Sequence, residues 1–316
     1  MIVTITGGAG FIGSHLCQRF LSKKTKVICI DNFSTGSKDN ITKMLKNPDF
    51  SLIKYDITIP FTRKLSAMIM ASQIIIHLAS PASPKDYYRL PLETALVNSV
   101  GSKYLLDLAR SGKKRFVLAS TSEIYGNPEQ NPQKEEYRGH VNPVGPRSCY
   151  DESKRFSEML TMIYYQQFGV DTRICRIFNT YGPGMRRNDG RVVANFISHA
   201  LQGEDLIIYG DGTQTRSFCY IDDTVEGIYL LAVKPGLSGK IVNIGNPEEI
   251  RIKDLANLII KLTDSFSRYH YIKKVEDDPE KRCPDITRIK TLLAWEPQVN
   301  LVDGLKKTIN FLRNNS

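Results

Sequence analysis

The feature that most constrains the fold is a glycine-rich turn close to the start of the chain. Residues 8–13 read Gly-Ala-Gly-Phe-Ile-Gly, follow an apolar run at residues 2–6, and are preceded by one more glycine. Glycines at this spacing allow a tight turn from a strand into a helix and let the backbone approach a pyrophosphate, while the helix N-terminus supplies free amides. The pattern predicts a dinucleotide-binding βαβ unit, whose cofactor-contacting residues are Gly7, Gly10, Phe11, Ile12 and Gly13.

Short apolar strands and amphipathic helices alternate through the first half of the chain. The predicted strands are residues 2–6, 26–30, 50–54, 74–78, 115–119 and 172–178, and the predicted helices are 12–22, 93–111 and 151–168. Such alternation is typical of βαβ units around a parallel sheet. We therefore predict an α/β fold with a Rossmann-type doubly wound parallel sheet that binds ligands at its carboxyl edge.

The regular alternation weakens from residue 179 onward, where Pro/Gly-rich loops at 181–184 and 209–212 separate shorter elements. We predict a dinucleotide-binding domain over residues 1–178 and a smaller, mainly substrate-binding domain over 179–316. Segments near 217–245 are expected to return to the larger domain, so that the two domains are interleaved.

An acidic residue at the end of the second predicted strand indicates which dinucleotide binds. Asp31 stands eighteen positions beyond Gly13, where its carboxylate can accept hydrogen bonds from an adenosine ribose and would repel a 2′-phosphate. No arginine follows it, so NAD is favoured over NADP. Asn32 is a further cofactor candidate, and Asp56 is expected to face the adenine, with a turn-capping role as the alternative.

Composition and charge argue against several other classes. The chain of 316 residues has a formal net charge of +10, but its basic residues form short clusters beside turns, with no nucleic-acid recognition module. Its six cysteines include no CxxC pair and no nearby histidine cluster, so neither a metal site nor a disulfide framework is predicted. No apolar stretch approaches the ~20 residues of a membrane span, and the N-terminus runs into the glycine turn rather than a cleavable signal. We expect a cytoplasmic protein without nucleic-acid or membrane partners.

Tyr150 and Lys154 lie four residues apart in a predicted helix, one helical turn from each other. Such a pair is common on helix surfaces, but a dinucleotide-binding turn upstream makes a redox site for an alcohol the better interpretation. A tyrosine has a usual pKa near ~10, and a neighbouring ammonium is expected to lower it by stabilising the phenolate. The predicted strand 115–119 ends in hydroxyl residues and one carboxylate, Glu123, at the same sheet edge.

Together these motifs resemble the extended short-chain dehydrogenase/reductase family, whose members rework nucleotide sugars, and the resemblance covers nearly the whole chain. The runs at residues 77–84, 142–152, 176–183, 189–193 and 209–218 are similar to those of the UDP-glucuronate decarboxylases within that family. The chain differs from their pattern at Lys85 and Asp86, where a proline or neutral polar residues are frequent.

The resemblance implies particular roles for residues of this chain. Thr121 matches the hydroxyl that joins Tyr150 at the sugar O4, and Lys154 matches the lysine that also binds the nicotinamide ribose. Glu123 matches the acidic residue of the decarboxylases, and Arg282 matches an arginine near the sugar carboxylate, with a solvated charge run as the alternative for Arg282. The implied substrate-binding residues are Tyr87, Asn179, Arg191, Tyr209, Arg216 and Arg282.

The implied activity is the NAD-dependent decarboxylation of UDP-glucuronate to UDP-xylose through a 4-keto intermediate, in a homodimer packed through the helices at residues 98–111 and 151–168. UDP-glucuronate 4-epimerases, whose strand end is usually serine-rich, and 4,6-dehydratases, which commonly place an aspartate where this chain has Ser122, are the alternatives. A catalytically silent NAD-binding sensor module is the non-enzyme alternative, although such a module would be expected to lose Tyr150 or Lys154. The sequence leaves open whether the product is UDP-xylose or the 4-keto pentose.

Overall fold

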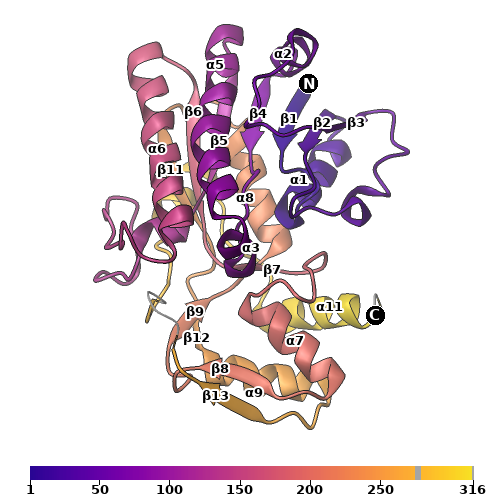
Figure 1. Ribbon diagram of the computed structural model, residues 1–316, viewed down its shortest axis with the longest axis vertical. Helices are drawn as coiled ribbons and strands as arrows, with labels where there is room; N and C mark the ends of the chain where they lie inside the picture. Colours follow the sequence, from indigo (N-terminus) through magenta and orange to yellow (C-terminus); the bar gives the residue numbers. More distant parts are fainter. Residues whose placement is uncertain (275–278, 315–316) are drawn as a thin grey trace.

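A seven-stranded parallel sheet forms the centre of the computed structural model, which describes residues 1–274 and 279–314 (Figure 1). Within these residues the strand order is β11-β6-β5-β4-β1-β2-β3, which contains the doubly wound order 3-2-1-4-5-6. The predicted fold class is confirmed. The strands are β1 (Ile2–Thr6), β2 (Lys26–Asp31), β3 (Phe50–Lys54), β4 (Ile74–His77), β5 (Arg115–Thr121), β6 (Thr172–Ile177) and β11 (Lys240–Ile244).

Helices cover both faces of this sheet, because its strands are apolar on both sides. In β4, Ile74 and Ile76 pack into the core beneath α1 (Phe11–Ser22) and α8 (Ile221–Val233). Ile75 between them packs into the opposite core, beneath α2 (Arg63–Met70), α5 (Ser102–Gly112) and α6 (Ser148–Phe168). Burying one such side chain contributes about 1.5–3 kcal/mol to the free energy of folding. Because alternate residues point to opposite faces, the strand stabilises the helix layers on both sides of the sheet.

The helix predicted over residues 93–111 is interrupted in the structure. It consists of α4 (Pro91–Leu96), a π-helical turn η2 (Val97–Gly101) and then α5. Asn98 in this turn is fully buried and donates to Ser80 Oγ at 3.1 Å and to Ser153 Oγ at 3.0 Å. The extra residue of the π-turn therefore turns the Asn98 side chain toward Ser80 and Ser153. Hydrophobic periodicity does not reveal this feature.

Two arginines, the buried Arg173 and the half-buried Arg115, connect the late segments of the chain to the sheet. Arg173 in β6 donates to the carbonyls of Leu231 and Lys234 at 2.5 Å each, at the C-terminal end of α8. Arg115 in β5 donates to Ala232 O at 2.7 Å, and both guanidiniums pair with Asp171. Cations at a helix C-terminus satisfy its free carbonyls and its dipole, so these contacts fix α8 against the sheet.

A smaller lobe lies below the carboxyl edge of the sheet in Figure 1. Its parallel pair β8 (Leu206–Tyr209) and β13 (Tyr269–Ile272) and its antiparallel pair β9 (Thr215–Ser217) and β12 (Glu249–Arg251) pack with helices. The helices of this lobe are α7 (Val192–Gln202), α9 (Ile252–Thr263) and α11 (Leu301–Asn314). The remaining elements are η1 (Lys38–Ile41), α3 (Pro84–Arg89), η3 (Ser122–Tyr125), β7 (Thr180–Tyr181), β10 (Cys219–Tyr220) and α10 (Thr287–Leu293).

Across residues 1–274 and 279–314, none of the helices has both the length and the apolar surface that crossing a lipid bilayer requires.

Candidate active site

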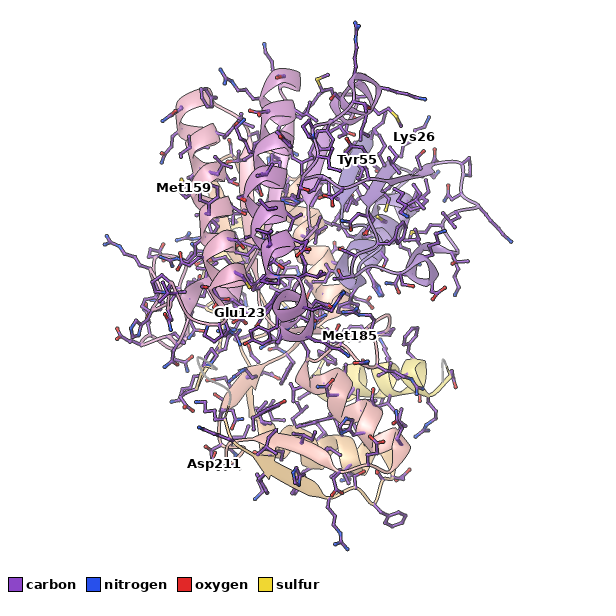
Figure 2. The ribbon with its side chains drawn as sticks, viewed as in Figure 1. Lys26, Tyr55, Glu123, Met159, Met185 and Asp211 are labelled. Carbon is purple, nitrogen blue, oxygen red and sulfur yellow. The ribbon has the colours of Figure 1, made fainter. Side chains whose placement is uncertain are left out.

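A cavity of about 970 Å³ lies where the carboxyl edge of the sheet meets the smaller lobe. Its size is at the upper end of the range usual for small-molecule sites. Figure 2 shows two of its lining residues, Glu123 and Met185, at the level where the two parts of the molecule meet. Every predicted site residue lines this cavity: Gly7, Gly10, Phe11, Ile12, Gly13, Asp31, Asn32, Asp56, Tyr87, Thr121, Glu123, Tyr150, Lys154, Asn179, Arg191, Tyr209, Arg216 and Arg282. Their individual roles remain predictions.

The glycine turn has the shape that a bound pyrophosphate requires. Gly7 has φ +72°, and a methyl group there would lie 2.6 Å from the Ala79 amide nitrogen. Within 4 Å, a methyl group on Gly10 would meet only Gly7 O, at 3.2 Å, so this position faces the cavity. Because α1 begins directly after Gly10, the free amides of its first turn are available to an anion at the same place. The turn therefore fits the diphosphate of a dinucleotide.

Asp31 ends β2 and is held by the backbone around the glycine turn. Its Oδ2 accepts from Ala9 N at 2.9 Å and its Oδ1 accepts from Phe33 N at 2.8 Å. Burial raises the pKa of this carboxyl, and the two amide hydrogen bonds oppose that rise. The carboxylate is thereby fixed at the edge of the cavity where a ribose would lie.

Asp56 and Asn32 contact each other beside the same edge. Asn32 Nδ2 donates to Asp56 Oδ2 at 3.1 Å, while Asp56 Oδ1 accepts from Thr58 N at 2.9 Å and from Thr58 Oγ1 at 2.7 Å. Burial raises the pKa of Asp56, but these hydrogen bonds outweigh it and bring the value below the usual one. Asp56 thus makes the turn-capping contacts considered as its alternative, and it also lines the cavity.

Tyr150 and Lys154 are both buried on the face of α6 that meets the end of β5. Lys154 Nζ donates to Ala119 O at 2.9 Å and lies 6.0 Å from the centre of the Tyr150 ring. Tyr150 forms a hydrogen bond with Thr121, and the ring of Tyr87 stacks on it at 5.2 Å with an interplanar angle of 7°. The hydroxyl of Tyr150 is therefore fixed between a sheet edge and an aromatic wall.

The pKa of Tyr150 is raised, not lowered as expected from the neighbouring ammonium. Burial raises the pKa of Tyr150 above its usual value, although the hydrogen bond with Thr121 and the charges of Arg191 and Arg147 oppose the rise. Burial also lowers the pKa of Lys154, to about 8. Sequence spacing gives the distance between the two groups along the helix but not the removal of both from water, which dominates here.

Glu123 lies between two arginines. It is the second residue of η3, and its carboxylate forms ion pairs with Arg282 from the late part of the chain and with Arg147 at the start of α6. Arg282 also donates to Gly126 O at 3.1 Å, and burial lowers its pKa to about 10. Arg282 is a buried site residue, so the solvated charge run considered for it is ruled out.

The sequence reasoning missed Arg147 as a site residue. It belongs to the run 142–152 that carries the family resemblance, and it stands three residues before Tyr150, but a lone arginine before a helix has no distinctive spacing. In the structure it lies 6.0 Å from the centre of the Tyr87 ring and 3.7 Å from Asp151 Oδ2, as well as against Glu123.

The predicted substrate residues surround the side of the cavity that faces the smaller lobe. Arg191 pairs with Asp189 and lies 5.8 Å from the ring centre of Phe11. Asn179 Nδ2 donates to Ser217 O at 3.5 Å, whereas Arg216 Nη1 donates to Thr215 O at 2.8 Å. Tyr209 is exposed at the rim. Guanidiniums in such positions suit the phosphates of a nucleotide.

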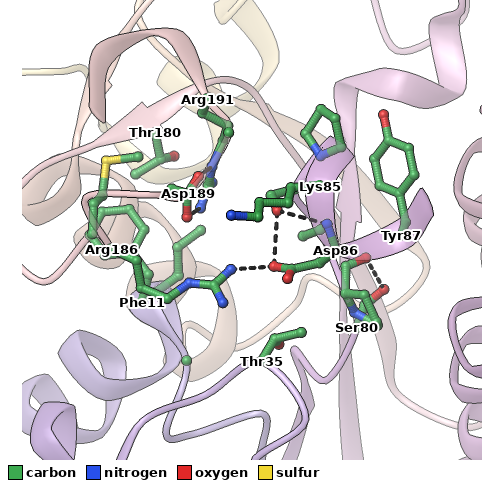
Figure 3. A pocket seen from close by; sticks show the side chains of 18 of the residues that line it. Phe11, Thr35, Ser80, Lys85, Asp86, Tyr87, Thr180, Arg186, Asp189 and Arg191 are labelled. Atoms are coloured by element: carbon green, nitrogen blue, oxygen red, sulfur yellow. Dashed lines mark hydrogen bonds and ion pairs between the residues drawn. The ribbon is translucent and has the colours of Figure 1, made fainter. Parts of the chain in front are cut away.

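Lys85 and Asp86, where the chain differs from the family pattern, contact the loop on the opposite side of the cavity. Figure 3 shows Arg186 extended toward Asp86, with which it forms an ion pair, and Lys85 bonds to Asn188 Oδ1. Asp86 also accepts from Ser83 Oγ at 2.9 Å, which holds it in place. These contacts join α3 to residues 186–188, and the residues that make them line the cavity.

The fold, the glycine turn and the Tyr150/Lys154 pair define an NAD-dependent oxidoreductase-like site of the short-chain dehydrogenase type. A family model described as "NAD dependent epimerase/dehydratase family" matches residues 3–245, and the chain belongs to this family. It is 47% identical over 311 residues to UDP-glucuronic acid decarboxylase 1 of Xenopus tropicalis, covering 98% of this chain and 72% of that protein.

Solved structures give the same fold. UDP-glucuronic acid 4-epimerase from Bacillus cereus, in complex with UDP-glucuronic acid and NAD, matches with a TM-score of 0.88 and 30% identity over 100% of both chains. A dTDP-glucose 4,6-dehydratase from Streptomyces venezuelae with NAD bound matches with a TM-score of 0.91 and 27% identity, over 100% of this chain and 98% of that one.

Proposed function

We propose that this protein is a UDP-glucuronate decarboxylase that uses NAD as a catalytic cofactor and forms UDP-xylose. The observation that carries the proposal is the contact between Glu123 and Arg282 beside Tyr150, in a chain that is 47% identical to a curated UDP-glucuronic acid decarboxylase. The epimerase and dehydratase alternatives are not favoured, because curated decarboxylases at about this level of identity match nearly the whole chain.

NAD fits the residues of the glycine turn and Asp31, and when bound it would accept the hydrogen of the sugar C4 and later return it. Gly10 leaves room for the diphosphate, and Asp31 is fixed where it can accept from ribose hydroxyls. Lys154, buried beside the end of β5, would hold the nicotinamide ribose.

Tyr150, in its phenolate form, would remove the proton from the sugar O4, and its hydrogen bond with Thr121 favours this form. The resulting C4 ketone is β to the carboxylate on C5. When the bond between C5 and the carboxylate breaks, its electron pair passes into the C4 carbonyl and carbon dioxide leaves. Thr121 and the protonated Tyr150 would donate hydrogen bonds to the enolate oxygen at the moment its charge develops.

The Tyr87 ring stacked on Tyr150 and the ion pairs of Glu123 support a sequence of oxidation, loss of carbon dioxide and reduction at one site. Tyr87 is buried and stacks on Tyr150, and Arg147 is buried beside Tyr87, so this side of Tyr150 is shielded from water. Addition of a proton at C5 would convert the enolate into the 4-keto pentose, and retention of this ketone until C4 is reduced would give the pentose as product.

Incubation of the purified protein with UDP-glucuronate and NAD, followed by mass analysis of the nucleotide sugar, tests the proposal. Loss of the mass of one carbon dioxide with the C4 alcohol intact is the expected result. An unchanged mass with inverted C4 would establish epimerisation instead, and loss of carbon dioxide with accumulation of the ketone would establish an oxidative decarboxylase.

We further propose that the protein is a homodimer in the cytosol. Four apolar or aromatic side chains of α6 are exposed in the single chain: Phe156, Met159, Tyr165 and Phe168. Figure 2 shows Met159 on α6 at the outer edge of the molecule, next to α5. Exposed apolar side chains along α6 support packing against a second copy, and light scattering would test it.

A further inference from the structure

Three buried charged groups from distant parts of the chain meet beside Tyr150. Glu123 follows β5, Arg147 precedes α6, and Arg282 comes from the late segment that runs past the smaller lobe. Their side chains are 16%, 10% and 3% exposed, respectively. One oxygen of Glu123 contacts Arg147 and the other contacts Arg282, so this carboxylate bridges two guanidiniums.

Arg282 is held in this position by its backbone as well as by its charge. Gln133 N donates to Cys283 O and Cys283 N donates to Gln133 Oε1, each at 2.8 Å. Arg147 is anchored at the first turn of α6, where its carbonyl accepts from Tyr150 N at 3.0 Å. The backbone that carries each arginine is therefore held in place by the fold, whereas Glu123 lies in a short 3₁₀ turn between them.

The bridging position has the chemistry of a carboxylate-binding site. Guanidiniums bind carboxylates through parallel hydrogen bonds, and buried arginines without an anion would be strongly unfavourable. The position also lies beside the residues that would hold the sugar O4, because Tyr87 stacks on Tyr150 and is 6.0 Å from Arg147. The substrate carboxylate is carried by C5, the direct neighbour of C4.

We propose that Arg147 joins Arg282, for which the family resemblance already implies a place near the sugar carboxylate, in binding this carboxylate, and that Glu123 occupies the subsite until the substrate displaces it. This inference rests on the proposed function, and it makes Arg147 a specificity-determining residue. On binding, the carboxylate of UDP-glucuronate takes the place of the Glu123 carboxylate between Arg147 and Arg282. A UDP-sugar without a carboxylate leaves the ion pairs of Glu123 with these two arginines intact.

Glu123 then has a second effect, on the bond-breaking step. As the bond from C5 to the carboxylate breaks, its electron pair moves to the C4 carbonyl, and the carboxylate loses its charge as it becomes carbon dioxide. Two guanidiniums that hold the carboxylate firmly would oppose this loss of charge. Competition from Glu123 for the same guanidiniums weakens their hold on the substrate carboxylate, so Glu123→Gln should bind UDP-glucuronate more tightly but decarboxylate it more slowly.

Binding measurements on the NAD-loaded protein test the subsite. Isothermal titration with UDP-glucuronate and with UDP-xylose, in a Tyr150→Phe background that prevents turnover, gives two affinities for each variant. Arg147→Met should weaken UDP-glucuronate binding by ~10-fold or more and UDP-xylose binding by less than about 2-fold, because only the former loses a charged hydrogen bond. Arg147→Lys should recover part of the loss, and Glu123→Gln should strengthen binding of UDP-glucuronate alone.

Arg110→Met is the matched control, since it removes one positive charge at an exposed position of α5 that does not line the cavity. It should leave both affinities unchanged. Equal weakening of both ligands by Arg147→Met, with unchanged circular dichroism and NAD affinity, would overturn the two-arginine subsite. Failure of the wild-type protein to convert UDP-glucuronate is a separate outcome, which would overturn the proposed function itself.

Discussion

Replacing Lys154 by methionine should stabilise the protein at neutral pH, although it removes a residue of the proposed active site. Burial lowers the pKa of Lys154 from its usual 10.5 to about 8. At about 1.4 kcal/mol per pH unit, this difference corresponds to an unfavourable contribution of about 3 kcal/mol from burying the ammonium. The variant also loses the hydrogen bond from Lys154 Nζ to Ala119 O, which offsets about 1–3 kcal/mol. The net gain at pH 7 is therefore between about 0 and 2 kcal/mol.

The pH dependence of stability separates the cost of burying the Lys154 charge from the contribution of its hydrogen bond to Ala119 O. Between pH 8 and 10.5 the unfolded chain keeps the Lys154 proton while the folded protein releases it, so the stability of the wild type rises with pH in this window. Relative to Lys154→Met, the wild type should gain about 2 kcal/mol between pH 7 and pH 9.5. Other titrating groups cancel in this difference.

Urea denaturation of both proteins at the two pH values measures the effect, with circular dichroism as the probe. A difference between wild type and variant that is the same at pH 7 and pH 9.5 would refute the reasoning. It would mean that the ammonium is not desolvated and that the pKa of Lys154 lies near its usual value. Turnover should be lost in the variant in either case.

Three further predictions concern other residues of the site and the fold. Tyr150→Phe should reduce turnover by ~10²–10⁴-fold and leave NAD affinity, followed by fluorescence titration, nearly unchanged; full activity would exclude Tyr150 as the base. Glu123→Ser should slow release of carbon dioxide more than the initial oxidation seen as NADH absorbance, and equal losses would mean that Glu123 only shapes the site. Arg173→Met should lower the free energy of unfolding by about 1–3 kcal/mol in urea, because the carbonyls of Leu231 and Lys234 lose their donor while Arg115 still pairs with Asp171; an unchanged free energy of unfolding would contradict that role.

Much of the central sheet could be predicted because its signals are local. The strands predicted at residues 2–6 and 50–54 have the observed bounds, and the others differ by one or two residues at an end. A glycine turn after an apolar strand needs no distant contact to be recognised. The π-turn at Val97–Gly101 was missed because its cause, the contacts of Asn98 with Ser80 and Ser153, lies in other segments.

The electrostatics of the site could not be predicted for a related reason. The pair of Tyr150 and Lys154 is visible in the sequence, but the pKa of each depends on how much water the rest of the fold removes. Arg147 and Arg282 are 135 positions apart in the sequence, and only the fold brings them to the same carboxylate. Because related epimerases and dehydratases share the fold, we expect the choice of reaction to depend on such distant charges more than on the motifs that identify the family. Charge substitutions at Arg147 and Glu123 should therefore change which substrate is bound while NAD binding at the glycine turn is unaffected.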